Sequence, residues 1–391
     1  MNPNFKFITI DPEKLEFHSS CSEGLDEFLL EEIKNSSLQI LSFNRGGVFY
    51  CGKRADIYNF LLSTRFSSRV SFTLHKFIAN NSDDLYDKAY SIPWERIIME
   101  DAAYKIESMA KDSLENSRFA LYRLKDAVQD RIRNKEKREA LIDREYPDIE
   151  IILRSNRENV TIAIGVTAKP FNKRGYRLDT VSAPIRENLA QALIHFSGWD
   201  RQSTFIDPMC GSGTIVIEAA LLLKNKGQIN QKLLFDSVIF KEMFKEEVQK
   251  FNSTFQETAL DSNNNKPPII YGYDIDPDAI KKAKKNIERA GVSDFIQLEV
   301  RDILQFSNTY NVGNGTIVTN PPYGERMGYA DELKEFYFEI GKILKDNFSG
   351  FRFTLICGDK SLLGHFRLKA DKEKSITISK LKGKFVSYLI Q

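Results

Sequence analysis

Four consecutive residues late in the chain, Asn320, Pro321, Pro322 and Tyr323, could hold an amine group in one orientation. They come one residue after the apolar run GTIV. A proline fixes its own φ angle and restricts the preceding residue to extended backbone. The side-chain carbonyl of Asn320 and the main-chain carbonyl of Pro321 could therefore each accept one N–H and aim the nitrogen lone pair. The ring of Tyr323 could stack on a base, a contact worth roughly 1 to 3 kcal/mol.

A glycine-containing turn earlier in the chain offers backbone N–H groups to a ligand. Residues 207–214 read DPMCGSGT, and a helical apolar pattern starts at Thr214. Because Gly211 and Gly213 have no side chains, the backbone can approach a ligand closely at this strand-to-helix turn. No Lys-Ser or Lys-Thr of a P-loop follows, and Val216 occupies the third glycine position of a dinucleotide fingerprint. Both phosphate-binding interpretations are therefore disfavoured.

Acids follow the next two strand-like runs. Asp274 ends the run PIIYGYD, and an acid in this place can accept hydrogen bonds from both hydroxyls of a ribose. Asp276 is the alternative, although its position before a proline fits the N-cap of a helix better. Asp302 follows the run FIQLEV and can accept from an exocyclic adenine amine. Ile275 and Ile303 could sandwich that ring.

A regular alternation of strands and helices would bring these residues to one edge of a sheet. This pattern predicts a parallel sheet covered on both faces, with ligands bound outside the carboxyl ends of the strands. A hairpin formed by SITISK and KFVSYLIQ closes the domain. Residues 225–268 exceed what one βαβ unit requires, so we expect an insertion with a helix in FKEEVQKFNSTF. The apolar strand-like runs are STFIDP, PIIYGYD, FIQLEV, GTIVTN and FRFTLICG.

Two smaller α+β units are predicted upstream. The first contains LEFHSS, a helical EGLDEFLLEEIKN and a hairpin signal around Arg45-Gly46-Gly47. The second contains a long helix near 117–137 and the strand-like runs DIEIILRS and NVTIAIGV. The long helix has a basic face, which by itself is more typical of a solvated surface with i,i+4 ion pairs than of a nucleic-acid contact. The stretch 168–184 is rich in glycine, proline and cations and is interpreted as a hinge.

Composition narrows the class of protein. The 391 residues exceed the usual size of one core and predict two or three domains. A net charge of +2 predicts that any polyanion meets local basic patches. No run of 18 apolar residues and no secretory signal is seen, so we expect a cytoplasmic protein without a membrane span. The four cysteines and four histidines are scattered without metal-ligand spacing, so neither disulfides nor a protein-bound metal is expected.

Taken together, several motifs resemble those of one family. FNKRGYR, APIRENLAQALI, SGWD, DPMCGSGTIVIEAA, GYDIDPDAI and IVTNPPYGER are similar to motifs of the bacterial THUMP-containing RNA guanine-N2 methyltransferases. These are class I S-adenosylmethionine-dependent enzymes, and they include large-subunit ribosomal RNA enzymes and transfer-RNA relatives. The resemblance implies an α/β, Rossmann-like domain at 167–391, with a seven-stranded, mostly parallel sheet. It further implies an α+β ferredoxin-like domain at 1–65 and a THUMP RNA-binding domain at 66–166.

The resemblance also assigns the site. The methyl donor would be S-adenosylmethionine and the product S-adenosylhomocysteine, with no metal. The catalytic residues would be Asn320, Pro321, Pro322 and Tyr323. The cofactor-binding residues would be Asp207, Pro208, Gly211, Gly213, Thr214, Asp274, Ile275, Asp302, Ile303 and Asn320. The RNA contacts would be Arg123, Lys125, Arg131, Lys173, Arg174 and Arg177.

The expected reaction is methylation of the exocyclic N2 amine of a guanine in RNA, with 23S ribosomal RNA as the first choice of substrate. Transfer RNA is an alternative substrate, and adenine N6 is an alternative target because the tetrapeptide does not distinguish the purines. A non-catalytic RNA-binding factor in ribosome assembly is an alternative of a different class. The retained acids and Asn320 argue against that last interpretation.

Overall fold

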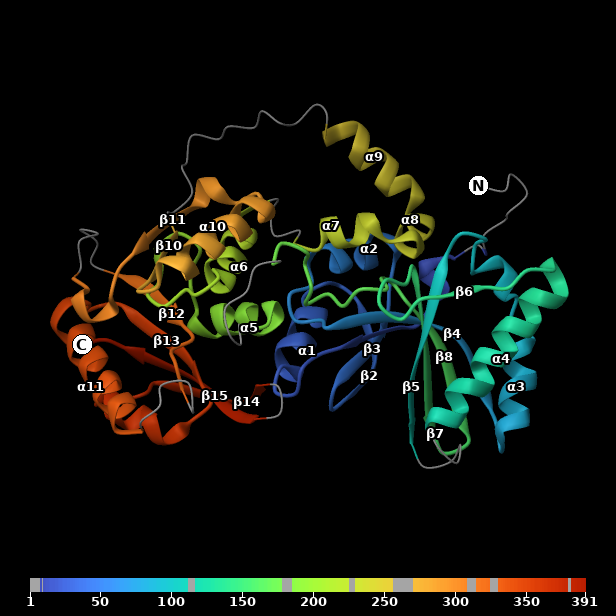
Figure 1. Ribbon diagram of the computed structural model, residues 1–391, viewed down its shortest axis with the longest axis horizontal. Helices are drawn as coiled ribbons and strands as arrows, with labels where there is room; N and C mark the ends of the chain where they lie inside the picture. The colour runs from blue at the N-terminus through green and yellow to red at the C-terminus, as the bar shows by residue number, and fades with distance from the viewer. Residues whose placement is uncertain are drawn as a thin grey trace.

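The computed structural model describes residues 8, 10–111, 117–177, 185–224, 229–255, 270–307, 314–323, 330–378 and 381–391. Two sheets lie along the long axis of the molecule, with β9–β15 toward one end and helices α3 and α4 at the other (Figure 1). Within these described ranges, no helix is both long and apolar enough to cross a membrane.

The first sheet has eight strands in the order β2-β3-β1-β4-β8-β7-β5-β6. Its central strand β4 pairs with β1 on one side and with β8 on the other, both antiparallel. The two predicted upstream units therefore share one continuous sheet. The predicted hairpin is confirmed, because β2 and β3 pair around Arg45-Gly46. The strands are β1 Phe17–Ser20, β2 Gln39–Asn44, β3 Gly47–Cys51, β4 Arg69–Ile78, β5 Ala103–Lys111, β6 Leu141–Ile142, β7 Ile149–Asn156 and β8 Asn159–Gly165.

Helices cover this sheet through amphipathic faces. In the long helix α4, Leu124, Val128 and Ile132 recur at helical spacing and are fully buried. Helix α3 packs beside α4 and begins at a strong N-cap, because Asn81 Oδ1 accepts from the N–H groups of Asp83 and Asp84. The helices are α1 Asp26–Lys34, α2 Arg54–Ser63, α3 Ser82–Tyr90 and α4 Ser117–Glu136, with short 3-10 turns at η1 Pro12–Lys14 and η2 Trp94–Arg96.

The second sheet has seven strands in the order β11-β10-β9-β12-β13-β15-β14. The first five strands are parallel, whereas β15 runs antiparallel to both β13 and β14. This is the predicted mostly parallel sheet with a C-terminal hairpin, so the fold class is confirmed. The strands are β9 Thr204–Asp207, β10 Ile270–Asp274, β11 Ile296–Val300, β12 Gly315–Thr319, β13 Arg352–Cys357, β14 Lys372–Ile378 and β15 Leu381–Leu389.

Helices pack on both faces of the second sheet. Buried side chains of α5, α6 and α10 join the apolar core that extends from the N-terminal half, whereas α11 belongs to a separate cluster. The chain leaves β9 toward β10 and later returns to the other side of β9 at β12, which is the usual place for a ligand site. The elements are α5 Glu187–Ser197, α6 Thr214–Leu223, α10 Pro277–Ala290 and α11 Ala330–Asn347, with 3-10 turns at η4 Ser293–Phe295, η5 Ile303–Gln305 and η7 Lys360–Phe366.

The predicted insertion connects the two halves of the protein. Its helices α7 Gln231–Asp236 and α8 Val238–Met243 lie beside α2, and α9 Lys245–Phe255 follows (Figure 1). Asn230 Nδ2, just before α7, donates to the carbonyl oxygens of Leu61 and Thr64 at 3.0 and 2.7 Å. Arg54 on α2 pairs with Glu247 on α9. Residues 225–228 and 256–268 of the insertion lie outside the described residues.

The predicted hinge at 168–184 is anchored where the structure describes it. Phe171, Arg174 and Tyr176 are all buried. A free linker would expose such side chains to solvent, so residues 171–177 form part of the packed contact between the two halves. Residues 178–184 of the predicted hinge lie outside the described residues.

Candidate active site

The carboxyl ends of β9 and β12 are joined by a buried side-chain hydrogen bond. Thr319 Oγ1 donates to Asp207 Oδ1 at 2.9 Å, and the Met209 N–H donates to the same oxygen at 3.2 Å. Burial raises the pKa of Asp207 to about 7, although these two hydrogen bonds act in the opposite direction. Asp207 Oδ2 is buried and has no partner in the part of the chain that the structure describes. Asp207 therefore links the two strands at which the sheet order reverses.

The glycine turn after β9 is tied to the end of β10. Gly211 and Gly213 have φ angles of +54° and +87°, in the region that favours glycine. The Gly211 N–H donates to Asp274 Oδ2 at 2.8 Å. A Cβ atom at Gly213 would lie only 3.2 Å from Cβ of Ala283 on α10, so the turn and that helix pack closely. The backbone of this turn lies beside the acid predicted to hold a ribose.

The three acids after β10 and β11 have distinct partners. Asp274 accepts the Gly211 N–H with one oxygen and the Asp276 N–H, at 3.0 Å, with the other. Asp276 accepts the N–H of Asp278 at 2.9 Å and so caps α10, as predicted. Asp302 caps the short turn η5 by accepting the Leu304 N–H at 2.9 Å. Asp274 is thus held in one orientation while its side chain stays partly exposed.

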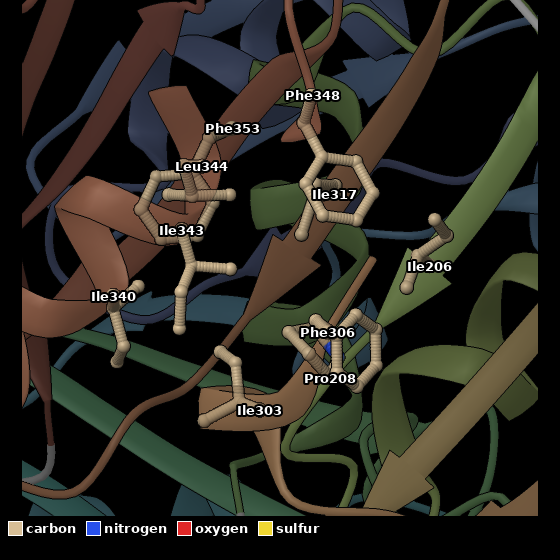
Figure 2. A pocket seen from close by; sticks show the side chains of 10 residues that line it. All are labelled: Ile206, Pro208, Ile303, Phe306, Ile317, Ile340, Ile343, Leu344, Phe348 and Phe353. Atoms are coloured by element: carbon tan, nitrogen blue, oxygen red, sulfur yellow. The ribbon is translucent and has the colours of Figure 1, made fainter. Parts of the chain in front are cut away.

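The expected sandwich of Ile275 and Ile303 is not formed. Ile275 is 66% exposed, whereas Ile303 is 6% exposed. Figure 2 shows the side chain of Ile303 beside a cavity that Pro208 also lines, between the sheet and α11. Ile303 begins the 3-10 turn η5, whose N-cap is Asp302, and its side chain packs in this cavity against residues of the sheet and of α11. The correction is that Ile303 and Pro208 pack around this apolar cavity, whereas Ile275 is exposed and stays a prediction as a cofactor contact.

That cavity belongs to the core. It is lined only by apolar side chains, so it offers no hydrogen bond to a nucleoside (Figure 2). Pro208, which begins the turn after β9, lines this cavity, so the cavity belongs to the core on which the glycine turn packs. The lining residues are Ile206, Pro208, Ile303, Phe306, Ile317, Ile340, Ile343, Leu344, Phe348 and Phe353.

The Asn-Pro-Pro-Tyr segment is fixed at Pro322 and Tyr323, whereas the side-chain oxygen of Asn320 has no donor among the described residues. Asn320 Oδ1 is buried and has no hydrogen-bond partner among the described residues. The Pro322 carbonyl accepts a hydrogen bond from Tyr337 Oη on α11 at 3.0 Å. The ring of Tyr323 lies on the backbone of Gly358, because a Cβ atom added there would be 2.7 Å from its Cε2 atom. Tyr337 and Gly358 were not found from the sequence, since only the fold brings α11 and the end of β13 to this segment.

The prediction that Arg174 contacts RNA is wrong, because this residue is buried. Its side chain is 3% exposed and pairs with Glu218, whose side chain is fully buried. Arg174 also donates to the side chain of Asn230 and to the carbonyl oxygen of Arg65. A guanidinium that is buried in this way supports the packing between the two halves and is not exposed to RNA.

The other predicted RNA contacts lie nearer the surface, and several are paired with acids. Arg131 forms two hydrogen bonds with Glu95, and Arg123 pairs with Asp83 at 2.6 Å. Lys125 lies 3.3 Å from the carboxylate of Asp126, and Arg177 lies 3.3 Å from that of Glu187. Lys173 is exposed. These five residues stay predictions as RNA contacts.

The sheet order, the glycine turn after β9, the acids after β10 and β11 and the Asn-Pro-Pro-Tyr segment after β12 define a class I S-adenosylmethionine-dependent methyltransferase. Comparison with known proteins then gives the family. Residues 174–386, more than half of the chain, match the family model of the RMKL-like methyltransferase domain. The chain therefore belongs to the RMKL-like methyltransferase family, and the predicted family is confirmed.

Two further family models match the upstream region. Residues 16–71 match the RlmL ferredoxin-like domain, and residues 79–165 match the THUMP domain. These are the two kinds of domain that the sequence predicted, in the predicted order. The boundaries at 65/66 and 166/167 stay predictions.

Curated relatives carry the name ribosomal RNA large subunit methyltransferase K/L. The protein of Shewanella amazonensis is 31% identical over 379 residues, which are 96% of this chain and 53% of the relative. The protein of Syntrophotalea carbinolica is 31% identical over 367 residues, which are 92% of this chain and 51% of the relative. The chain thus spans about half the length of these curated relatives.

Solved structures match over nearly the whole chain. A protein described as a possible methylase from Clostridium difficile 630 has 30% identity and a TM-score of 0.76, covering 96% of this chain and 98% of its own. SMU.472, solved in complex with SAH, has 24% identity and a TM-score of 0.80 with the same two coverages. The likeness to SMU.472 shows the fold.

Proposed function

We propose that this protein transfers a methyl group from S-adenosylmethionine to the exocyclic N2 amine of a guanine in 23S ribosomal RNA, leaving S-adenosylhomocysteine and one amine proton, which passes to water. The observation that carries the proposal is the buried side-chain carbonyl of Asn320, which lacks a hydrogen-bond partner among the described residues. A buried acceptor without a donor costs free energy. Its presence at the end of β12 favours a ligand that supplies an N–H.

The residues of the Asn-Pro-Pro-Tyr segment would position the amine. The side-chain carbonyl of Asn320 and the main-chain carbonyl of Pro321 each accept one N–H, which favours a tetrahedral nitrogen with its lone pair directed out of the ring plane. Tyr323 stacks on the target base, which must leave any helix in which it starts. Correct positioning of two reactants can contribute about 7 to 11 kcal/mol to lowering a barrier.

The acids after β10 and β11 fit the methyl donor. When bound, S-adenosylmethionine supplies an electrophilic methyl group on a positively charged sulfur. Asp274 would accept the ribose hydroxyls, and two backbone N–H groups already orient its carboxylate. Asp302 would accept the adenine amine. The backbone at Gly211 can approach the donor closely because glycine has no side chain, and Gly213 lets the same turn pack against Ala283 of α10.

The choice of RNA rests on the upstream domains and on the relatives. Residues 79–165 match the THUMP domain, and the curated relatives are named as ribosomal RNA large subunit enzymes. A ribosomal RNA substrate would place the reaction in the cytoplasm. The Asn-Pro-Pro-Tyr segment itself suits the exocyclic amine of either purine.

The test uses the purified chain, S-adenosylmethionine with a labelled methyl group, and RNA from a strain in which the gene is deleted. Separate reactions contain 23S ribosomal RNA, 16S ribosomal RNA and transfer RNA. Mass spectrometry of the digested nucleosides then identifies the methylated base. We expect N2-methylguanosine from 23S ribosomal RNA, and a rate of label transfer roughly 10²- to 10³-fold lower with the Asn320→Ala variant at the same enzyme concentration.

Each other outcome contradicts a defined part of the proposal. Label in transfer RNA would show that transfer RNA is the substrate. N6-methyladenosine in the digest would show that adenine is the target base. RNA binding and donor binding without any transfer of label would favour a non-catalytic RNA-binding factor.

A further inference from the structure

A buried tyrosine on α11 holds the segment that carries the proposed amine site. Tyr337 Oη donates to the Pro322 carbonyl at 3.0 Å, and the tyrosine side chain is fully buried. Burial is the largest cause that raises the pKa of Tyr337, so the hydroxyl keeps its proton and acts as a donor. The peptide unit after Pro322 is therefore fixed by a residue that lies outside the motif.

Packing fixes the position of this hydroxyl. The ring of Tyr337 lies 4.7 Å from the ring of Phe366, measured between centroids. Cys357 Sγ, at the end of β13, lies 3.9 Å from Tyr337 Oη and donates to the carbonyl oxygen of Asp359 at 3.0 Å. Tyr337 is thus held between the end of β13 and η7.

The residue after β13 supports the aromatic ring of the motif. A Cβ atom at Gly358 would lie 2.7 Å from Cε2 and 2.9 Å from Cδ2 of Tyr323. Cβ atoms in proteins do not approach other atoms so closely, so any larger residue at position 358 would displace the ring. On the other side of the motif, Thr319 is hydrogen-bonded to Asp207. The open acceptor of Asn320 therefore lies between two fixed ends.

We propose that Tyr337 and Gly358 are positioning residues of the methyl-transfer site. The hydroxyl of Tyr337 sets the direction of the Pro322 peptide, and Gly358 sets the plane in which Tyr323 stacks on the target base. Neither residue touches the base or the methyl donor. The inference rests on the proposed function, because it assigns both residues to the same reaction.

The test measures kcat and KM of the full chain for the Tyr337→Phe and Gly358→Ala variants. Tyr337→Phe removes only the hydroxyl, and Gly358→Ala adds only the atom that would contact Tyr323. We expect each change to lower kcat roughly 3- to 10-fold, since a misplacement of the reacting groups acts on the transition state. The dissociation constant of S-adenosylmethionine, measured by calorimetry, should stay within about twofold of wild type, because that site lies on other loops.

Two control variants match these changes. Tyr388→Phe removes another buried tyrosine hydroxyl, from a side chain that also packs on Phe366. Gly364→Ala adds a Cβ atom where no atom lies within 4 Å. Both controls should keep the wild-type kcat, and thermal unfolding of all four variants checks that they are folded.

The outcomes separate the inference from the proposed function. Wild-type kcat in both Tyr337→Phe and Gly358→Ala would overturn the positioning role. An equal loss in the variants and their controls, or a loss of donor affinity, would assign the effect to general packing and would also overturn it. No methyl transfer by the wild-type chain would instead refute the proposed function, and the positioning role would fail with it.

Discussion

Arg174 Nε lies 3.0 Å from Glu218 Oε1, and the two side chains are 3% and 0% exposed. Glu218 also accepts hydrogen bonds from Tyr176 Oη and Gln191 Nε2, both at 2.8 Å. Arg174 reaches the carbonyl oxygen of Arg65 in the first half of the chain. This ion pair therefore connects the upstream domains to a helix that starts at the glycine turn of the methyltransferase domain.

Replacing Arg174 by methionine should destabilise the protein strongly. The change leaves the carboxylate of Glu218 buried without its cation, and breaking a buried pair from one side costs about 3 to 5 kcal/mol. Denaturant unfolding measures the loss. The control is Lys173→Met, because that neighbouring side chain is exposed. An Arg174→Met variant as stable as wild type would contradict this prediction and would show that the donors Tyr176 and Gln191 are enough to hold Glu218 in the core.

The sequence predicted the sheet of the methyltransferase domain because its signals are local. Each strand is a short apolar run followed by a helical pattern, and the N-cap of α10 is formed by neighbouring residues, Asp276 and Asp278. Arg174 was predicted to contact RNA because the family resemblance implies an RNA substrate and because Arg174 lies in a cation-rich stretch interpreted as a hinge. Its partner is 44 residues away in the otherwise apolar helix TIVIEAALLL. Glu218 is the single acid in this apolar helix, and it was the available sign that a buried cation lies opposite.

The motif residues of the site could be predicted from the sequence, whereas the residues that hold those motifs in place could not. Asn320 and Asp274 follow strands whose ends must meet, so their neighbourhood could be predicted. The contacts of Tyr337 and Gly358 depend on how α11 and the end of β13 pack, which no local pattern specifies. Ile303 comes three residues after the end of β11, where the short turn η5 begins, and its side chain packs between the sheet and α11.

Asn320→Ala should lower turnover roughly 10²- to 10³-fold, by analogy with the loss of one preorganised polar contact. The physical reason is that the amine loses one of its two acceptors. The affinity for S-adenosylmethionine, measured by calorimetric titration, should be almost unchanged. Turnover at the wild-type rate would remove Asn320 from the mechanism, and a large loss of donor affinity would assign it to the cofactor site.

Asp274→Ala and Asp276→Ala form a matched pair of neighbouring acids. Asp274→Ala should weaken donor binding, since it removes the carboxylate that the Gly211 and Asp276 N–H groups orient. Asp276→Ala should leave donor binding intact and cost about 1 kcal/mol of stability, because Asp276 caps α10. Calorimetry and denaturant unfolding separate the two effects. Unchanged donor affinity in Asp274→Ala would move the ribose contact to Asp276.

Stability should depend on pH through Asp207. Burial raises the pKa of this carboxyl to about 7 in the folded protein, against about 3.9 in an unfolded chain. The folded state therefore holds the proton more tightly. The stabilisation from Asp207 is fully present below about pH 4 and is lost as the pH rises through about 7. The change in unfolding free energy is at most about 4 kcal/mol for three pH units.

The Asp207→Asn variant isolates this dependence. Asparagine keeps the size of the side chain and its carbonyl acceptor for Thr319 but carries no titrating proton. Burial also raises the pKa of Glu187 to about 7, so the wild-type profile alone would mix two groups with the same sign. Denaturant unfolding of both proteins is measured between pH 4 and 8. The unfolding free energy of wild type should fall steeply as the pH rises, whereas that of Asp207→Asn should fall less. Parallel curves would mean that Asp207 stays ionised in the folded protein, with its charge held by Thr319 and the Met209 N–H.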